Sequence, residues 1–231
     1  MKSVDEVVSH SLHPLSHEKV QELAKDPHVF IIDARSAPHF IQGHIPGSVC
    51  CPIDAQFAIW STYISDPRKD EKIILVVPEG REKEAITRLT RTGLDNVVGY
   101  VEGGFEKWAQ AGLPVTKIDN VQYESKEEFE TKIAASRVID VRNLGEWEDG
   151  VHKKSELVTL ANIKEAAASS QDAKTAKFHV HCKGGVRSTL ACSLLQRYGF
   201  TDVHNVAGGS DQMKSKGVEF APMTQQPKKT L

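Results

Sequence analysis

The chain has 231 residues, with 29 Lys and Arg against 31 Asp and Glu, and a formal net charge of −2. This near-neutral balance gives no overall field for nucleic acid or anionic lipid, so we expect neither as a partner. The length suits two domains of roughly 110 residues each. No apolar run is long enough to span a membrane and the N-terminus lacks the apolar core of a signal peptide, so we expect a cytoplasmic protein.

Residues 1–15 precede the first clear helix start and are interpreted as an N-terminal extension. This segment contains His10 and His13, and His17 follows closely. Histidines without thiolate or carboxylate neighbours rarely form a metal site. We therefore interpret them as solvated surface histidines and expect no metal and no cofactor.

The first domain opens with a helix that Ser16 can cap, with Leu15 and Val20 spaced as a hydrophobic staple. An apolar strand follows at 29–32 and ends in an Asp-x-Arg sequence at 33–35. The pattern predicts a helix followed by a buried strand.

The second half of the chain repeats this order. Ser125 and Glu128 form a capping box, and the strand at 138–139 ends in Asp140-Val141-Arg142. Because the same Asp-x-Arg sequence stands in both halves, we interpret Asp140 and Arg142 as a structural ion pair that supports a neighbouring loop.

Two further strands in each half complete the repeat. We predict them at 72–75 and 96–98 and at 178–181 and 203–206, with intervening helices that end near Gly93 and Gly199. Alternating strands and helices indicate a parallel α/β sheet in each half. We predict domains at 16–117 and 118–222, a linker at about 114–122, and a flexible tail at 223–231, which lacks apolar anchors.

Cys182 stands where the strand at 178–181 gives way to a helix. A loop that feeds a helix N-terminus can turn backbone N–H groups inward, and the helix dipole adds positive charge there. The pattern predicts a lowered pKa for the Cys182 thiol and a thiolate nucleophile. Two glycines permit close backbone approach, and two cations and a hydroxyl lie nearby. The expected binding residues are Lys183, Gly184, Gly185, Val186, Arg187 and Ser188.

The other cysteines, at 50, 51 and 192, form no disulfide framework or metal pattern. We interpret all three as small apolar core residues. His181 precedes the thiol on its strand, so alternation turns its side chain away from the sulfur and a general-base role is not expected. His152 could reach the site entrance, although this is the less favoured interpretation.

The matching loop of the first half carries no thiol. An alignment without gaps that places Arg81 opposite Arg187 sets Val76 opposite Cys182. Valine has no nucleophilic atom, and a proline and two glutamates in the same loop oppose anion binding. We therefore predict a catalytically silent first domain with a structural role.

Taken together, these motifs resemble tandem rhodanese domains. The motifs are the two Asp-x-Arg sequences, Gly-His-Ile-Pro-Gly at 43–47, Gly-Gly-Phe-x-x-Trp at 103–108 and Cys-x-x-Gly-x-Arg at 182–187. The resemblance covers residues 16–220. It implies two rhodanese-like α/β domains, each with a central, mainly parallel sheet flanked by helices.

The resemblance implies a sulfurtransferase that works through a Cys182 persulfide. The thiol would take sulfane sulfur from thiosulfate or a low-molecular-weight persulfide and pass it to cyanide or a thiol. Amides of residues 183–187 would stabilise the terminal sulfur, Lys183 and Arg187 would attract a sulfonate, and Arg187 could also fix the loop.

Two other functions stay open. Phosphatases and arsenate reductases of this fold carry a loop one residue longer, which makes the six-residue loop here a poorer match. A non-catalytic sulfur carrier or interaction module would use the same thiol with another protein. The second half also departs from the family with Gly-Val-His-Lys-Lys at 150–154 and with Ser-Asp-Gln-Met at 210–213, so the substrate is left open.

The first half resembles one group of relatives more narrowly, through its segments at 57–60 and 77–82. In these bacterial fusions, a metallo-β-lactamase-fold persulfide dioxygenase precedes two rhodanese units. The chain has no His-x-His-x-Asp-His motif, so we expect no dioxygenase activity in it. A persulfide dioxygenase is a candidate partner, and the chain would be a detached relative or the C-terminal portion of a longer protein.

Overall fold

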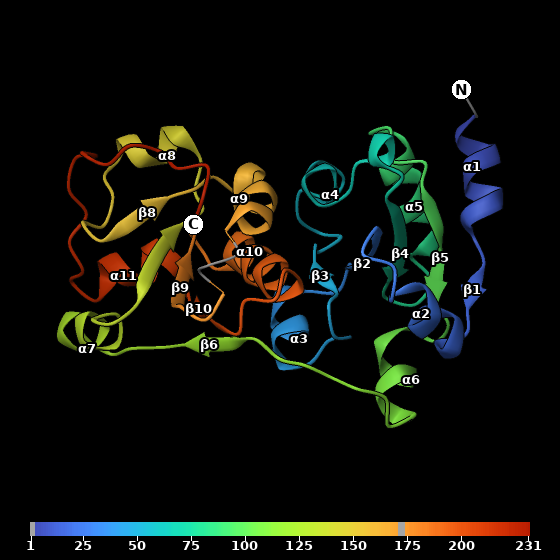
Figure 1. The fold of residues 1–231 in the computed structure, drawn as a ribbon, viewed down its shortest axis with the longest axis horizontal. Helices are drawn as coiled ribbons and strands as arrows, with labels where there is room; N and C mark the ends of the chain where they lie inside the picture. The colour runs from blue at the N-terminus through green and yellow to red at the C-terminus, as the bar shows by residue number, and fades with distance from the viewer. Residues whose placement is uncertain (1–2, 171–173) are drawn as a thin grey trace. The chain divides into compact units, whose positions relative to one another are not determined.

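The computed structural model describes residues 3–170 and 174–231 and divides the chain into two compact units between Lys117 and Ile118 (Figure 1). Each unit contains a five-stranded sheet in which all neighbouring strands are parallel. Helices flank each sheet, so the α/β architecture predicted from the alternating pattern is confirmed.

In the first unit the strand order is β1-β5-β4-β2-β3. Its strands are β1 (Pro14–Leu15), β2 (Val29–Asp33), β3 (Val49–Cys50), β4 (Lys72–Val76) and β5 (Val97–Val101). Its helices are α1 (Val4–Ser11), α2 (His17–Leu23), α3 (Ala37–Gln42), α4 (Phe57–Ile64), the 3-10 helix η1 (Pro67–Lys69), α5 (Glu82–Thr90) and α6 (Gly104–Gln110).

In the second unit the order is β6-β10-β9-β7-β8, the same arrangement. Its strands are β6 (Asp119–Val121), β7 (Arg137–Asp140), β8 (Ser155–Leu157), β9 (Lys177–His181) and β10 (Asp202–Val206). Its helices are α7 (Lys126–Lys132), α8 (Leu144–Glu148), the 3-10 helix η2 (Leu160–Asn162), α9 (Ile163–Ser169), α10 (Val186–Arg197) and α11 (Gly209–Ser215).

The central strands are buried on both faces. All five residues of β2 are buried, and in β4 and β9 only the first residue is exposed. Helices that cover both faces of a parallel sheet remove the polar face, so β2 and β4 are almost continuously apolar, whereas β9 also carries the buried His179 and His181. Strand ends therefore become the places where polar side chains gather.

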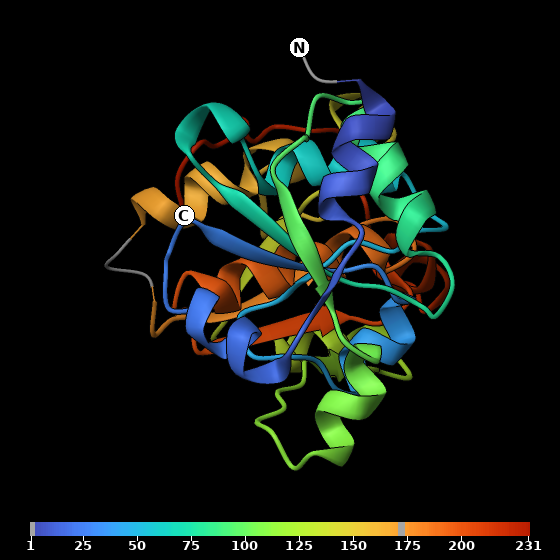
Figure 2. The same cartoon turned by 90° about the vertical axis from the view of Figure 1, so that its right-hand side faces the viewer.

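The N-terminal segment is part of the first unit, which corrects the interpretation of residues 1–15 as an extension. Helix α1 packs beside α5 (Figures 1 and 2), and β1 pairs with β5 as the edge strand. The Ser11 hydroxyl is 1% exposed and donates to the Val97 carbonyl at 2.8 Å. His17 also has a defined neighbour, since its Nε2 atom lies 3.2 Å from the Glu102 carbonyl oxygen.

The predicted linker at 114–122 is likewise partly a strand. Residues 119–121 form β6, which pairs with β10 at the edge of the second sheet. Strands of two or three residues are too short to show an apolar period, so neither β1 nor β6 was visible in the sequence. In each unit, one of the two edge strands thus comes from a segment that we interpret from the sequence alone as an extension or a linker.

The C-terminal tail is anchored, contrary to the predicted flexibility of residues 223–231. The Lys228 amide donates to the Leu157 carbonyl at 2.7 Å, and the Leu231 amide donates to the Ser170 hydroxyl at 2.7 Å. Hydrogen bonds from backbone amides hold the tail. Every residue except proline can donate such a bond, so the absence of apolar side chains in the tail gave no sign of them.

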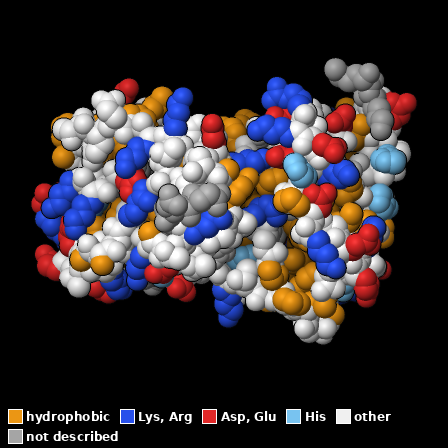
Figure 3. All heavy atoms as spheres, in the orientation of Figure 1, with side chains coloured by type: hydrophobic (Ala, Val, Ile, Leu, Met, Phe, Trp, Pro, Cys, Tyr) orange, Lys and Arg blue, Asp and Glu red, His pale blue; other side chains and the backbone are white. Residues whose placement is uncertain are grey.

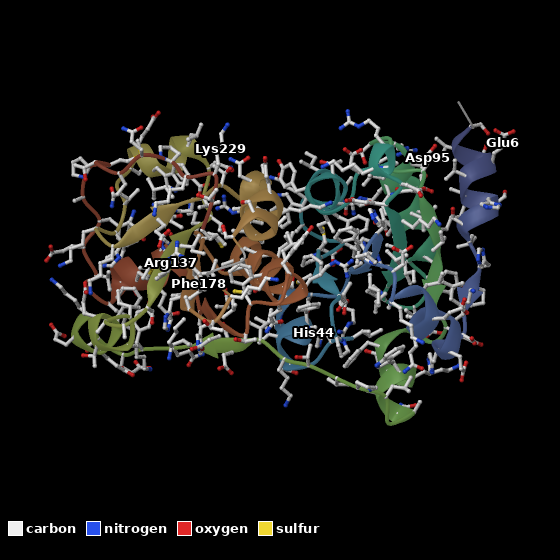
Figure 4. All side chains as sticks on the ribbon, in the orientation of Figure 1. Glu6, His44, Asp95, Arg137, Phe178 and Lys229 are labelled. Carbon is white, nitrogen blue, oxygen red and sulfur yellow. The ribbon has the colours of Figure 1, made fainter. Side chains whose placement is uncertain are left out.

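The tail also shares an ion-pair cluster with the sheet. Glu156 on β8 accepts from Arg137 on β7 at 2.6 Å and from the Lys228 ammonium at 2.9 Å. The Arg137 guanidinium lies 4.9 Å from the centre of the Phe178 ring on β9, and Figure 4 shows the two side chains together. The tail therefore adds a cation to an existing pair on the sheet.

Charges are mixed over the surface. On the face shown in Figure 3, Lys and Arg side chains alternate with Asp and Glu over each unit. Within residues 3–170 and 174–231, no helix combines the length and the hydropathy that crossing a bilayer requires.

We expect Ser11→Ala to lower the free energy of unfolding by roughly 1–3 kcal/mol, because the buried Val97 carbonyl loses its donor from α1. Urea unfolding of the full chain measures this loss. Ser9→Ala changes an exposed serine of the same helix and should have little effect. Equal effects of the two substitutions would show that α1 does not stabilise the first unit through this contact.

Candidate active site

The cysteine loop lies at the carboxyl end of β9. Cys182 directly follows the strand, and Gly185 caps α10 with a φ of 101°, a conformation that favours glycine. The Cys182 Sγ atom accepts the N–H of Gly185 at 3.1 Å and lies 3.5 Å from the Ser188 hydroxyl. The thiol thus sits among donors at a helix N-terminus, as the sequence pattern predicts.

Access to this thiol is narrow. Cys182 is only 1% exposed, whereas Lys183 and Gly184 in the same loop are exposed. A reactant therefore has to present a slender group to the sulfur. A terminal sulfur atom meets this requirement, and a bulky substituent does not.

The start of α11 holds the loop in its conformation. The Ser210 amide donates to the Cys182 carbonyl at 2.7 Å, and the Asp211 amide donates to the Lys183 carbonyl at 3.1 Å. In a planar trans peptide the next N–H points opposite to the carbonyl. The N–H groups of Lys183 and Gly184 therefore point away from α11.

Gly209 allows this close approach. Its φ is +55°, and an added Cβ atom would lie 2.4 Å from the Cys182 carbonyl oxygen and 2.5 Å from that of Lys183. Both distances are shorter than real Cβ contacts, and the obstacles are backbone atoms. The Gly-Gly sequence at 208–209, where α11 begins, therefore also shapes the cysteine loop.

Arg187 is held by a glutamate that sequence analysis missed. Its Nη1 and Nη2 atoms donate to the two carboxylate oxygens of Glu146 on α8 at 2.6 and 2.7 Å. These hydrogen bonds lower the pKa of Glu146. Arg187 also interacts with the Cys182 side chain, by a hydrogen bond and by charge. The hydrogen bonds to Glu146, together with this interaction, raise the pKa of Arg187.

A buried histidine, His181, directly precedes Cys182. His181 is fully buried, with Nδ1 at 3.4 Å from the Cys182 carbonyl oxygen and Nε2 at 3.2 Å from the Ser155 hydroxyl. Burial lowers the pKa of His181, so the ring is neutral near pH 7. Its Nε2 atom also lies 3.8 Å from Asp140 on β7, and none of these contacts involves the sulfur.

The Asp-x-Arg sequences form buried ion pairs in both units. Arg142 donates to Asp140 at 2.7 Å and to the Gly150 carbonyl at 2.8 Å. Arg35 makes the same contacts in the first unit, to Asp33 at 2.6 Å and to the Gly43 carbonyl at 2.9 Å. The pair thus occurs in both units, whether or not they contain a thiol.

The aromatic side chain missing after Gly208-Gly209 is supplied from elsewhere. In the first unit, Arg35 lies 3.9 Å from the ring centre of Phe105, in the Gly-Gly-Phe motif. In the second unit, Arg142 lies 5.4 Å from the ring centre of Phe220, beyond α11. The guanidinium keeps an aromatic neighbour although the motif has lost it.

The remaining candidates belong to the core. His152 is 1% exposed, and its Nε2 atom lies 3.2 Å from Glu130, so the structure gives it a core position and not one at the entrance. Cys50, Cys51 and Cys192 are fully buried. Burial raises the pKa of Cys51 to about 12 and raises that of Cys192 as well, which makes both thiols poor nucleophiles.

Strand register corrects the alignment of the two loops. Asp33 pairs with Val76, whereas Asp140 pairs with His181. Val76 therefore corresponds to His181, and Val77 takes the position of Cys182. The gapless alignment on the helices failed because the two segments differ by one residue between strand and helix. The position still holds a valine, which offers no nucleophilic atom.

Arg81, in the first-unit loop, forms ion pairs with two carboxylates that are more exposed than Glu146. It donates to Asp54 at 2.7 Å and to Glu84 on its own helix at 2.8 Å. Both partners are well exposed, so these pairs contribute little to stability. Arg81, like Arg187, is thus engaged by carboxylates.

The parallel sheets and the thiol at a helix N-terminus define an α/β protein with a cysteine loop at the carboxyl end of a central strand. The chain belongs to the rhodanese family, because the Rhodanese-like domain matches residues 16–111 and 125–216. Both units described above are thus rhodanese-like domains.

Individual relatives cover only parts of the molecule. The tRNA uridine(34) hydroxylases of Chlamydia felis and Chlamydia caviae are 29% and 31% identical to the chain over 106 and 93 residues. These matches cover 42% and 37% of the chain, and 33% and 28% of the relatives. The chain therefore spans about a third of the length of these curated relatives.

Two of the solved structures that the chain is similar to are described as a rhodanese-related protein and a thiosulfate sulfurtransferase. A rhodanese-related protein from Thermoplasma volcanium has 24% identity and a TM-score of 0.38, covering 44% of the chain and 100% of its own. A thiosulfate sulfurtransferase from Pseudomonas aeruginosa has 13% identity and a TM-score of 0.40, covering 99% of the chain and 44% of its own.

We expect Gly209→Ala to destabilise the second unit and loosen the cysteine loop. The matched control is Gly104→Ala, because Gly104 has a φ of +64° at the same helix position, yet its Cβ would meet a flexible side-chain oxygen at 3.3 Å and a backbone oxygen at 3.6 Å, an ordinary contact distance. Left-handed backbone alone costs about 1–2 kcal/mol in either variant. The clash should add at least about 1 kcal/mol at Gly209.

Urea unfolding and amide hydrogen exchange measure the two effects. Exchange at residues 183–185 should accelerate in Gly209→Ala and stay unchanged in Gly104→Ala. Equal losses of stability with unchanged exchange would show that α11 does not determine the loop conformation.

Proposed function

We propose that the second unit is a sulfurtransferase that carries sulfane sulfur as a persulfide on Cys182. The observation that carries this proposal is the Cys182 sulfur beside the Gly185 amide, 3.1 Å away, at the N-terminus of α10. Amide donors and a helix dipole favour a thiolate and also the anionic terminal sulfur of a persulfide. The family assignment supports the same class of chemistry.

The reaction divides into two displacements. The Cys182 thiolate attacks the outer sulfur of thiosulfate or of a low-molecular-weight persulfide, and the S–S bond of the donor breaks with its electron pair on the leaving sulfite or thiolate. An acceptor thiolate or cyanide then attacks the terminal sulfur, and Cys182 leaves as a thiolate. Backbone N–H groups of the loop stabilise the bound sulfur, while Arg187 fixes the loop against α8.

The first unit takes no chemical part in this proposal, since Val77 stands in the thiol position. Its sheet, its Asp33–Arg35 pair and its core persist without a nucleophile. A persulfide dioxygenase is the proposed partner, on the resemblance of the first unit to the rhodanese part of such fusions.

Intact-protein mass spectrometry tests the proposal. After exposure to thiosulfate or glutathione persulfide, we expect the wild-type chain to gain the mass of one sulfur atom. Cys182→Ser should lower the rate of gain by at least about a thousandfold, because the nucleophile is lost. Cys192→Ala removes the other cysteine of the second unit and should retain the gain, since that thiol is fully buried.

Three results would overturn the proposal. A gain that persists in Cys182→Ser would place the chemistry elsewhere. Hydrolysis of a phosphate ester or reduction of arsenate, without persulfide formation, would favour the phosphatase or reductase. Loading only from a partner protein, with no turnover of either small donor, would identify a sulfur carrier.

A further inference from the structure

Glu146 is fixed in the position where it neutralises Arg187. Besides the two hydrogen bonds from Arg187, its carboxylate accepts the Asn143 amide at 3.0 Å, and its carbonyl accepts from Arg142 at 3.0 Å. Side-chain exposure is 16% for Arg187 and 27% for Glu146. Glu146 is thus held through its side-chain carboxylate and its backbone carbonyl, and both it and Arg187 are partly buried. We therefore do not expect Glu146 to release Arg187 readily to an incoming anion.

The cationic charge left for a substrate is therefore small. The Arg187–Glu146 pair has no net charge, and Lys183 is exposed. Lys183 forms no ion pair within the described segments 3–170 and 174–231. Besides its backbone N–H groups, the cysteine loop thus offers one solvated cation, Lys183, and the Arg187 guanidinium, which interacts with the Cys182 side chain but whose charge is balanced by Glu146.

The two donor classes differ sharply in the charge that they bring. Thiosulfate is a dianion, so its reaction with the Cys182 thiolate gathers three negative charges and releases sulfite, another dianion. A protonated thiol persulfide, R–S–SH, brings none, and the reacting pair carries one negative charge. In a buried site, like charges repel strongly, so the first reaction needs cations that Glu146 has already neutralised.

We propose that Glu146 makes the Cys182 site selective for thiol persulfides over thiosulfate. This inference rests on the proposed sulfurtransferase function. The Cys182 thiolate attacks the outer sulfur of R–S–SH, the S–S bond breaks, and its electron pair leaves on the inner sulfur as R–S⁻. The proton stays on the transferred sulfur, so Cys182–S–SH and a thiolate are the products.

The first unit shows that the fold does not require this carboxylate. The residue four positions after Arg35 is His39, whereas Glu146 stands four positions after Arg142. Helix α3 forms nevertheless, with His39 on the Ser36 hydroxyl at 2.9 Å. Substitution of Glu146 by the neutral Gln, which also serves in a capping box, should therefore leave α8 folded.

The test compares sulfur loading of Cys182 from cysteine persulfide and from thiosulfate, as second-order rate constants from intact masses. In the wild-type chain we expect the persulfide to react at least about tenfold faster, and Glu146→Gln should raise the thiosulfate rate about tenfold and the persulfide rate less than about threefold. Glu148→Gln removes the same charge from an exposed position on α8 and should leave the ratio unchanged.

Equal or faster loading by thiosulfate in the wild-type chain would overturn the inference, whatever the variants do. So would an unchanged donor ratio in Glu146→Gln with a wild-type circular dichroism spectrum. If that variant does not fold, Lys183→Gln takes its place, and it should slow thiosulfate more than the persulfide. Failure of both donors to load Cys182 would instead refute the proposed function itself.

Discussion

The cysteine loop depends on two backbone hydrogen bonds from the first turn of α11. Ser210 and Asp211 hold the carbonyl groups of Cys182 and Lys183, so the following amides are turned away from that helix. Strand order makes this contact possible, because β10 lies next to β9 and delivers α11 beside the end of β9. Because Gly209 has no side chain, α11 can lie close enough to the carbonyl groups of Cys182 and Lys183 to form these hydrogen bonds. Loop conformation is thus a consequence of sheet topology and one glycine.

The two units show which contacts the fold requires and which the chemistry requires. Both keep the buried Asp-x-Arg pair and an aromatic ring beside its guanidinium, although the ring comes from Phe105 in one unit and from Phe220 in the other. A planar cation buried at a strand end needs a face to pack on, and either position can supply it. A motif search cannot detect that Phe220 supplies the ring from a distant position. It shows only that Ser210 stands where the first unit has an aromatic residue.

Local signals in the sequence were sufficient for most of the architecture. Ser16 and Ser125 cap their helices as predicted, and the apolar runs form the central strands. The predicted capping box is wrong in its second half, because the Glu128 carboxylate accepts the Glu124 amide and not that of Ser125. The edge strands β1 and β6 escaped because two or three residues carry no period. Val77 was misplaced because a helix alignment cannot reveal a one-residue difference before the helix. The pair of Glu146 and Arg187 lies 41 positions apart, and only the folded chain shows that these side chains meet.

The sheet of the first unit is complete although its loop carries no thiol. Pro78 has no N–H to offer, and Arg81 turns to exposed carboxylates, yet β4 and α5 keep their buried faces. In the second unit the loop is tied to α8 through Arg187 and to α11 through its carbonyls. These contacts hold the cysteine loop in one conformation. A nucleophile that relies on oriented backbone amides requires such a fixed loop. The ordering contacts, more than the shared fold, therefore separate the loop that carries a thiol from the one that carries a valine.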